Sequence, residues 1–154
     1  MKRRCLFSLL LITFAAASYA QSTGPDPVHW TFREVHSTDN SLEIRLAAHM
    51  ERGWHIYAQV QPKEAISQPT KISFRGNPLV QLQGPVNEQG NKETYTDKTA
   101  GILQYQYADS VVFSQLAVLK GKAKTRITGT ITYQTCTGEM CLPPKTIPFS
   151  IAIP

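Results

Sequence analysis

The sequence predicts an all-β protein, an antiparallel β-sandwich built from about eight or nine short strands. Apolar and polar residues alternate along most of the chain. Clusters of Gly, Pro, Asn and Asp separate the alternating stretches, and no apolar repeat with the helical period persists over several turns. We therefore expect strands with one buried and one exposed face, and no substantial helix.

The segments with the clearest alternation carry an apolar residue at every second position. They are residues 28–33, 42–46, 54–59, 126–133 and 146–153. Weaker strands are expected at Lys71–Phe74, Leu79–Gln83, Gln104–Tyr107 and Val111–Val118. Trp30 and Trp54 fall within this pattern and are expected in the core. Short strands separated by turn residues in this way are typical of an immunoglobulin-like sandwich.

One stretch breaks the alternation. Residues 84–101 are polar and rich in turn-forming residues, and they are expected to form a long surface loop. Loops of this length without regular structure are uncommon in compact domains and often carry function. A simple surface excursion is the other interpretation of this polar segment.

Residues 1–20 have the features of a secretory signal peptide. The basic residues Lys2, Arg3 and Arg4 precede an apolar run from Leu6 to Ala17, and Ser18-Tyr19-Ala20 supplies the small-x-small cleavage pattern. The apolar run is shorter than the roughly 18–20 residues that a membrane span needs. We expect export to the periplasm, cleavage after residue 20 and a single domain over residues 21–154.

Export changes both the charge and the cysteine count. Three of the sixteen Lys and Arg lie in the signal peptide, which leaves thirteen against eleven Asp and Glu, a net charge of about +2. No basic run interleaved with aromatic residues remains, so nothing indicates nucleic acid as a partner. Cys5 is removed, and Cys136 and Cys141 remain in a compartment where disulfides persist.

The two remaining cysteines bracket a predicted turn. Cys136 ends a well-patterned strand, and Thr137-Gly138-Glu139 has the composition of a turn. Cys141 is followed by Leu142 and two prolines, which cannot continue a strand ladder. Both sulfurs are therefore expected at the mouth of one hairpin-like connection, close enough for a disulfide.

The residues alone leave three uses of this pair open. A structural disulfide that closes so small a ring contributes only about 2 kcal/mol in the chain-entropy model. Cu(I) could bind both thiolates and Met140, whereas zinc would need a larger ligand set and every histidine lies at position 55 or earlier, far from the pair in sequence. Thiol–disulfide exchange through Cys136 and Cys141 is the use that a small, exposed ring favours.

The flanks of the cysteines carry a resemblance to a known family. Tyr133-Gln134-Thr135-Cys136 and Cys141-Leu142-Pro143-Pro144 resemble the active-site region of the N-terminal periplasmic domain of the thiol:disulfide interchange protein DsbD. Members carry a strand ending in Tyr-Gln-x-Cys, and a second cysteine followed by an aromatic residue or leucine and Pro-Pro. Gly53-Trp54-His55-Ile56-Tyr57 is similar to the family's Gly-aromatic-aromatic-aliphatic-Tyr segment, and the similarity extends in order over most of residues 28–153.

The resemblance implies an immunoglobulin-like domain that acts as a protein-disulfide reductase or electron-transfer domain, with no cofactor beyond its own cysteines. Electrons would come from a membrane-embedded reductase through a thioredoxin-like periplasmic donor and pass to disulfide isomerases and related thioredoxin-fold proteins. Cys141 is implied to form the mixed disulfide with partners, and Cys136 to resolve it. The alternative is a non-catalytic immunoglobulin-like binding module whose disulfide is structural.

Further site residues follow from the same resemblance. Family members shield the cysteine pair with a mobile cap loop, for which the polar segment defined above is the candidate. Its shielding aromatic is implied to be Tyr95, with Glu93 and Asp97 as nearby carboxylates, although ordinary loop residues are an equal interpretation. Tyr57 matches the family pattern, whereas His55 stands where an aromatic hydroxyl is usual. The four residues between the cysteines also differ from the five of better-known members.

The sequence ends at Pro154, so the family's membrane domain and C-terminal thioredoxin-like domain are not in it. A standalone protein and one part of a longer protein both stay open. In either case Cys136 and Cys141 are expected to carry out the same chemistry.

Overall fold

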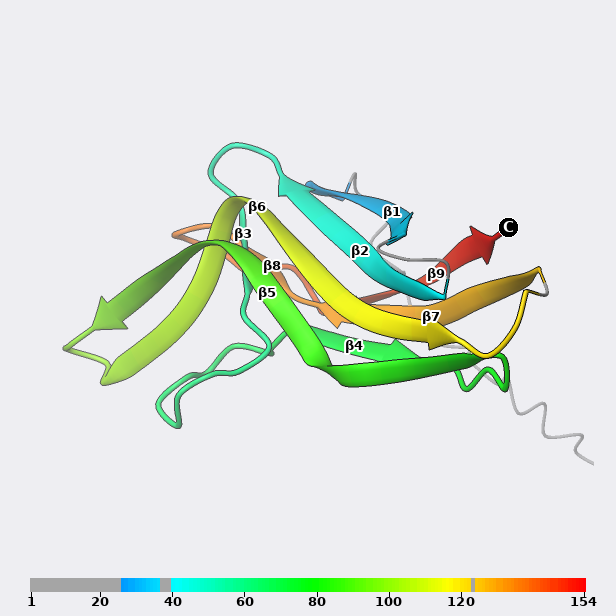
Figure 1. Ribbon diagram of the computed structural model, residues 1–154. Helices are drawn as coiled ribbons and strands as arrows, with labels where there is room; N and C mark the ends of the chain where they lie inside the picture. The colour runs from blue at the N-terminus through cyan, green and yellow to red at the C-terminus, as the bar shows by residue number, and fades with distance from the viewer. Residues whose placement is uncertain (1–25, 37–39, 123) are drawn as a thin grey trace, which may run out of the picture.

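The computed structural model describes residues 26–36, 40–122 and 124–154, and the predicted signal peptide lies outside them. The described residues form strands arranged in two antiparallel sheets (Figure 1). They contain no helix, and therefore none long and apolar enough to cross a membrane. The prediction of an all-β antiparallel sandwich of the immunoglobulin-like type is confirmed.

The larger sheet has six strands and is organised around one of them, β6. One edge of β6 pairs with β2 and then β3, and its other edge pairs with β5. β1 extends the sheet beyond β2, and β8 extends it beyond β3. The strands are β1 (Val28–His36), β2 (Ser41–Met50), β3 (His55–Tyr57), β5 (Val80–Asp97), β6 (Ile102–Leu119) and β8 (Thr135–Cys136).

The smaller sheet has the order β4-β7-β9 and covers the apolar face of the larger one. Its strands are β4 (Lys71–Phe74), β7 (Thr125–Tyr133) and β9 (Lys145–Ile153). Aromatic side chains join the two layers: the ring centroids of Trp30 and Tyr133 lie 5.3 Å apart, and those of Phe32 and Phe149 lie 5.8 Å apart. The core therefore sits between the sheets, as the alternating sequence predicts.

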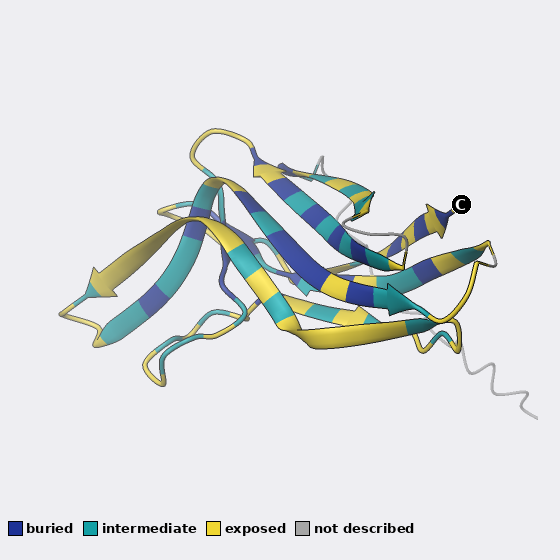
Figure 2. Cartoon of the chain, viewed as in Figure 1, coloured by how far each residue is buried: buried dark blue, intermediate teal, exposed yellow. Residues whose placement is uncertain are grey.

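Burial follows the predicted alternation where a strand has one face on the core. In β2, Leu42, Ile44 and Leu46 are at most 1% exposed, and the residues between them are only partly buried (Figure 2). Trp30 and Trp54 pack against the core, as expected. Because this pattern fixes which face each strand presents, it also fixes the register of the sheet.

The prediction of a structureless loop over residues 84–101 is wrong. Strand β5 runs as far as Asp97 and pairs with β6 along its length, with irregularities between Gln83 and Asn87 and between Gly90 and Lys92. We call the outer part of this pair, residues 92–107, the hairpin arm; it extends beyond the sandwich and is mostly exposed on the β5 side (Figures 1 and 2). Backbone pairing makes it a strand, and no buried face requires apolar residues there.

A local break in β6 positions the short strand β3. Asp109 has a φ of 59° and lies between Ser110, which pairs with β2, and Ala108, which pairs with β3. Aspartate tolerates this left-handed conformation better than most residues. β3 therefore forms a separate short ladder at the end of the sheet, with β6 on one side and β8 on the other.

Candidate active site at the cysteine hairpin

The backbone of residues 135–142, which we call the cysteine hairpin, holds the two cysteines opposite each other. Cys136 and Cys141 form an antiparallel bridge, with Cα atoms 4.0 Å apart and their sulfurs joined in a disulfide. The N–H of Thr137 donates to Met140 O at 2.8 Å, and the N–H of Leu142 donates to Thr135 O at 2.9 Å. The cysteines thus occupy a non-hydrogen-bonded position, where side chains of paired strands come closest.

The turn of the hairpin is stabilised by its first residue. The Thr137 hydroxyl oxygen accepts hydrogen bonds from the N–H groups of Glu139 and Met140, at 3.2 and 3.1 Å. Threonine commonly stabilises a tight turn through such bonds to the backbone that follows. The turn predicted at residues 137–139 is confirmed, and the backbone that follows β8 lies at the end of the sandwich from which the hairpin arm extends (Figure 1).

The two cysteines differ in their exposure to solvent. Cys136 is 0% exposed, whereas Cys141 is exposed to solvent. Its neighbour Met140 is 55% exposed. A thiolate from another molecule can therefore approach Cys141, while Cys136 is enclosed by protein.

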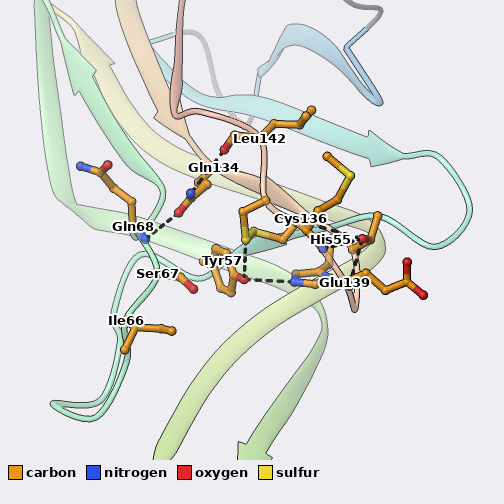
Figure 3. Close-up of a disulfide and its surroundings, with 12 residues drawn as sticks. His55, Tyr57, Ile66, Ser67, Gln68, Gln134, Cys136, Glu139 and Leu142 are labelled. Atoms are coloured by element: carbon orange, nitrogen blue, oxygen red, sulfur yellow. Dashed lines mark hydrogen bonds between the residues drawn. A yellow bond between two sulfur atoms is a disulfide. The ribbon is translucent and has the colours of Figure 1, made fainter. Parts of the chain in front are cut away.

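The predicted supporting residues His55 and Tyr57 lie beside the disulfide. His55 is directly opposite Cys136 in the β3–β8 ladder, and Tyr57 projects from the same face two residues further on. The Tyr57 hydroxyl is 4.0 Å from Cys141 Sγ, and His55 Nε2 is 3.2 Å from that hydroxyl (Figure 3). Tyr57 is only 3% exposed, so its hydroxyl is held inside the protein.

The environment of His55 favours the neutral imidazole. Burial lowers the pKa of His55, and the negative charge of Glu93 raises it by less, so the pKa lies below its ordinary value of 6.5. Glu93 is on β5, opposite Gln106, and Gln106 is in turn opposite Tyr57. This carboxylate, named in the sequence analysis beside the candidate cap aromatic Tyr95, therefore acts on His55 from the far side of β6.

Tyr95 and Asp97 lie further out, on the hairpin arm. Tyr95 is 45% exposed and pairs with Gln104 of β6. The Asp97 carboxylate accepts hydrogen bonds from the N–H groups of Thr99 and Ala100, at 2.9 and 3.0 Å, and so stabilises the turn at the tip of the arm. Cys141 remains exposed in this arrangement, with both side chains placed out along the arm.

A second segment, residues 58–70, lies against the cysteine hairpin and was not predicted as part of the site. Gln134 joins the two: its side-chain oxygen accepts from Gln68 N–H at 3.1 Å, and its side-chain nitrogen donates to Leu142 O at 3.3 Å (Figure 3). Gln104 holds the same segment from β6, because its side-chain oxygen accepts from the N–H groups of Ile66 and Ser67 and from the Ser67 hydroxyl. The sequence feature that could have pointed to this segment is its length, because residues 58–70 form a long connection between β3 and β4.

Within residues 26–36, 40–122 and 124–154, no three His, Cys, Asp or Glu side chains gather so that they could hold an ion. Chemically, the arrangement offers a disulfide between one exposed and one enclosed cysteine, with a hydroxyl beside the sulfur of the exposed one.

Comparison with known proteins identifies a family whose model matches most of the chain. The family model described as "Thiol:disulfide interchange protein DsbD, N-terminal" matches residues 25–152. No curated protein matches the chain. Among solved structures, the chain is similar to the reduced DsbD N-terminal domain of Neisseria meningitidis, with 18% identity, 80% of this chain and 84% of that chain covered, and a TM-score of 0.47.

Two further solved structures are similar. One is the N-terminal periplasmic domain of ScsB from Proteus mirabilis, with 16% identity, 82% of this chain and 44% of that chain covered, and a TM-score of 0.49. The other is the complex between the DsbD N-terminal and PilB N-terminal domains of Neisseria meningitidis, with 16% identity, 79% and 80% covered, and a TM-score of 0.44. Because the family model spans residues 25–152, the chain belongs to the family of the N-terminal domain of the thiol:disulfide interchange protein DsbD.

Proposed function

We propose that this chain is a periplasmic thiol–disulfide exchange domain that relays electrons through Cys136 and Cys141. The donor is a thioredoxin-like domain supplied by a membrane reductase, and the acceptors are oxidised thioredoxin-fold proteins of the disulfide-isomerase type. The observation that carries the proposal is a disulfide between one exposed and one enclosed cysteine, in a chain of the DsbD N-terminal family.

Reduction of the domain takes two exchange steps. A donor thiolate attacks Cys141 Sγ, which breaks the bond to Cys136 and forms a mixed disulfide; the Cys136 sulfur leaves with the electron pair and takes up a proton. The donor's second thiolate then attacks the donor sulfur of the mixed disulfide and releases Cys141 as a thiolate. The domain gains two electrons, and the donor is left oxidised with its own disulfide.

Transfer to the acceptor runs the same chemistry in the opposite sense. The Cys141 thiolate attacks the acceptor disulfide and forms a mixed disulfide, while the acceptor's other sulfur leaves and is protonated. Cys136 loses its proton and attacks Cys141 Sγ, which releases the reduced acceptor and restores the Cys136–Cys141 bond. No cofactor takes part in either direction.

The assignment of the two roles rests on access. A partner's sulfur must approach the reacting cysteine sulfur along the line of the bond that breaks. Of the two cysteines, Cys141 is exposed and Cys136 is enclosed. Cys136 needs only to reach Cys141, which the hairpin already holds opposite it. Cys136 is therefore suited to resolve mixed disulfides, because it cannot be approached by a second protein.

The proposed location and partners draw on the family. The similar ScsB domain is described as periplasmic, and a similar DsbD N-terminal domain forms a complex with a PilB N-terminal domain. We infer that residues 1–20 direct export and are cleaved, and that residues 21–154 function as one domain in the periplasm.

The experiment that tests the roles is mixed-disulfide trapping with a purified oxidised thioredoxin-fold isomerase. Cys136→Ser removes the resolving thiol, so the complex through Cys141 should accumulate on a non-reducing gel. Cys141→Ser should give no complex, and the double variant serves as the control. A complex that forms without Cys141 would overturn the role assignment.

The reduction potential of the pair separates exchange from a purely structural bridge. Equilibration with glutathione or dithiothreitol buffers should give a value between roughly −180 and −270 mV, the range of proteins that exchange disulfides. A value below about −300 mV would identify an inert bridge and favour a non-catalytic binding module.

A further inference from the structure

A short hydrogen-bonded series leads from the sheet to the exposed sulfur. His55 Nε2 is 3.2 Å from the Tyr57 hydroxyl, and that hydroxyl is 4.0 Å from Cys141 Sγ (Figure 3). Tyr57 has one hydroxyl hydrogen for these two neighbours. A sulfur within a disulfide has no hydrogen to donate, so the hydrogen between Tyr57 and Cys141 comes from Tyr57. His55 must then donate from Nε2 to the Tyr57 oxygen.

We propose that His55 is a positioning residue for the exchange reaction: its Nε2–H directs the Tyr57 hydroxyl toward Cys141, where that hydroxyl stabilises the thiolate. The inference rests on the proposed exchange chemistry of Cys141. When that sulfur becomes a thiolate, the hydrogen bond from Tyr57 becomes charge-assisted and therefore stronger. The stabilisation lowers the pKa of the Cys141 thiol and increases the fraction of thiolate at neutral pH.

The surroundings hold this arrangement in place. Tyr57 is 3% exposed, so its hydroxyl has little access to solvent, and its backbone oxygen accepts a hydrogen bond from the Thr70 hydroxyl at 2.6 Å. The rings of His55 and Tyr57 meet edge to face with centroids 5.3 Å apart. His55 is in turn fixed opposite Cys136 by the β3–β8 ladder.

The state of His55 decides which way the Tyr57 hydroxyl points. In the neutral Nε2–H form and in the protonated form, Nε2 donates and the hydroxyl is free to donate to sulfur. In the other neutral tautomer, Nε2 accepts the hydroxyl hydrogen and the sulfur loses it. Protonation removes this competing tautomer, so the pKa of the Cys141 thiol should be lower when His55 is protonated than when it is neutral. The titratable groups facing the ring or its strand are Tyr57, Cys136, Cys141, Glu139, Asp109 and Glu93.

The test uses residues 21–154 carrying Cys136→Ser, in which Cys141 is the remaining cysteine. It measures the thiol pKa of Cys141 from thiolate ultraviolet absorbance, and the rate of reaction with a small aromatic disulfide. His55→Phe should raise that pKa by about one unit, the size of one lost charge-assisted hydrogen bond. The tenfold loss of thiolate is offset by about threefold greater nucleophilicity, so the rate near neutral pH should fall about threefold.

Two further variants show whether His55 acts through Tyr57. His55→Gln keeps a side-chain N–H donor that does not titrate. The thiol pKa of Cys141 should therefore stay close to its value in the protein with His55, and the pH dependence that His55 imposes should disappear. Tyr57→Phe should raise the thiol pKa as His55→Phe does, and adding His55→Phe to it should cause no further change. Urea unfolding of each variant verifies that the fold is retained, and the glutamine variant keeps the test valid if phenylalanine disrupts it.

The outcomes separate this inference from the proposed function. An unchanged thiol pKa in His55→Phe, or a His55 effect that persists without Tyr57, overturns the positioning role while partner exchange stands. A thiol pKa that shifts as expected in a protein that forms no mixed disulfide with thioredoxin-fold proteins supports the positioning role and overturns the proposed function.

Discussion

Asp26 and Lys145 are in direct contact although 119 residues separate them: Lys145 Nζ lies 2.7 Å from Asp26 Oδ2. The same carboxylate accepts hydrogen bonds from the Tyr133 hydroxyl and, at 3.1 Å, from Val28 N–H. Tyr133 ends β7 and Lys145 begins β9, so the two donors flank the segment that carries the cysteine hairpin. Asp26 thereby ties the chain ahead of β1 to both ends of that segment.

This contact predicts a loss of stability in acid. Burial alone would raise the pKa of Asp26, but hydrogen bonds from Lys145, Tyr133 and Val28 outweigh it and hold the pKa below its ordinary value of 3.8. The stabilisation is therefore present above the ordinary value and is lost as the pH falls through the pKa of the folded state. Asp26→Asn should lower the free energy of unfolding by about 1 kcal/mol at neutral pH and reduce its decline below pH 3.8.

Urea unfolding at neutral pH and at about pH 3 measures both effects. Glu64→Gln, which removes a carboxylate from an exposed position, is the matched control and should change neither. If Asp26→Asn loses stability in acid as steeply as the unmodified protein, the contact does not contribute to the pH dependence.

A second prediction concerns Gly129, where β7 passes close to its neighbours. A Cβ at this position would lie 2.2 Å from Ser73 O and 2.5 Å from the Phe149 ring. Backbone cannot yield as a flexible side chain can, so Gly129→Ala should destabilise the domain by about 3 kcal/mol or prevent folding. Gly76→Ala, where an added Cβ meets nothing within 4 Å, should leave the urea midpoint nearly unchanged and serves as the control. Equal midpoints for the two variants would contradict the prediction.

The sequence predicts those strands that bury one face in the core and leave the other face at least partly exposed. Leu42, Ile44 and Leu46 alternate with polar residues because every second residue of β2 faces the core. β5 has no such pattern, because much of it is an edge strand exposed on both faces. Its pairing with β6 uses backbone groups, which every residue except proline provides equally. A polar edge strand and a polar loop therefore look alike in sequence.

The same reasoning explains which residues of the site could be predicted from the sequence and which could not. The cysteine pair and its neighbours Tyr57 and His55 could be identified because they lie within short sequence motifs. The contacts of Gln104 and Gln134 with residues 66–68 could not, since they join segments distant in sequence through single side chains. Alternation also does not reveal which cysteine is enclosed, because that depends on the strand beside it.

A third prediction tests the anchoring of residues 58–70. Gln104 is 5% exposed, and its side-chain oxygen accepts from Ser67 N–H at 3.1 Å and Ile66 N–H at 3.3 Å. Gln104→Leu removes the acceptor, so the amide hydrogens of Ile66 and Ser67 should exchange with solvent at least about tenfold faster, the equivalent of one lost hydrogen bond. Hydrogen exchange followed by mass spectrometry or NMR measures the effect.

Gln106→Leu is the matched control for this variant. Gln106 lies two residues further along β6 and donates to Glu93 at 3.2 Å instead of holding the segment. Its loss should leave exchange at Ile66 and Ser67 unchanged. Faster exchange in both variants would indicate a general loosening of β6, and no change in Gln104→Leu would show that other contacts hold the segment.

The last prediction is that the domain stays folded when Cys136 and Cys141 are reduced. The bond closes a ring with a sequence separation of only 5, which the chain-entropy model values at about 2 kcal/mol. Backbone hydrogen bonds on both sides of the pair already hold the hairpin together, and they remain after reduction. Urea unfolding with and without reductant should therefore show a loss of about 2 kcal/mol or less, with Cys136→Ala/Cys141→Ala as an oxidation-independent comparison. A carrier that cycles between the two states must remain folded in each, so unfolding upon reduction would instead identify the bond as a structural staple and argue against the exchange function.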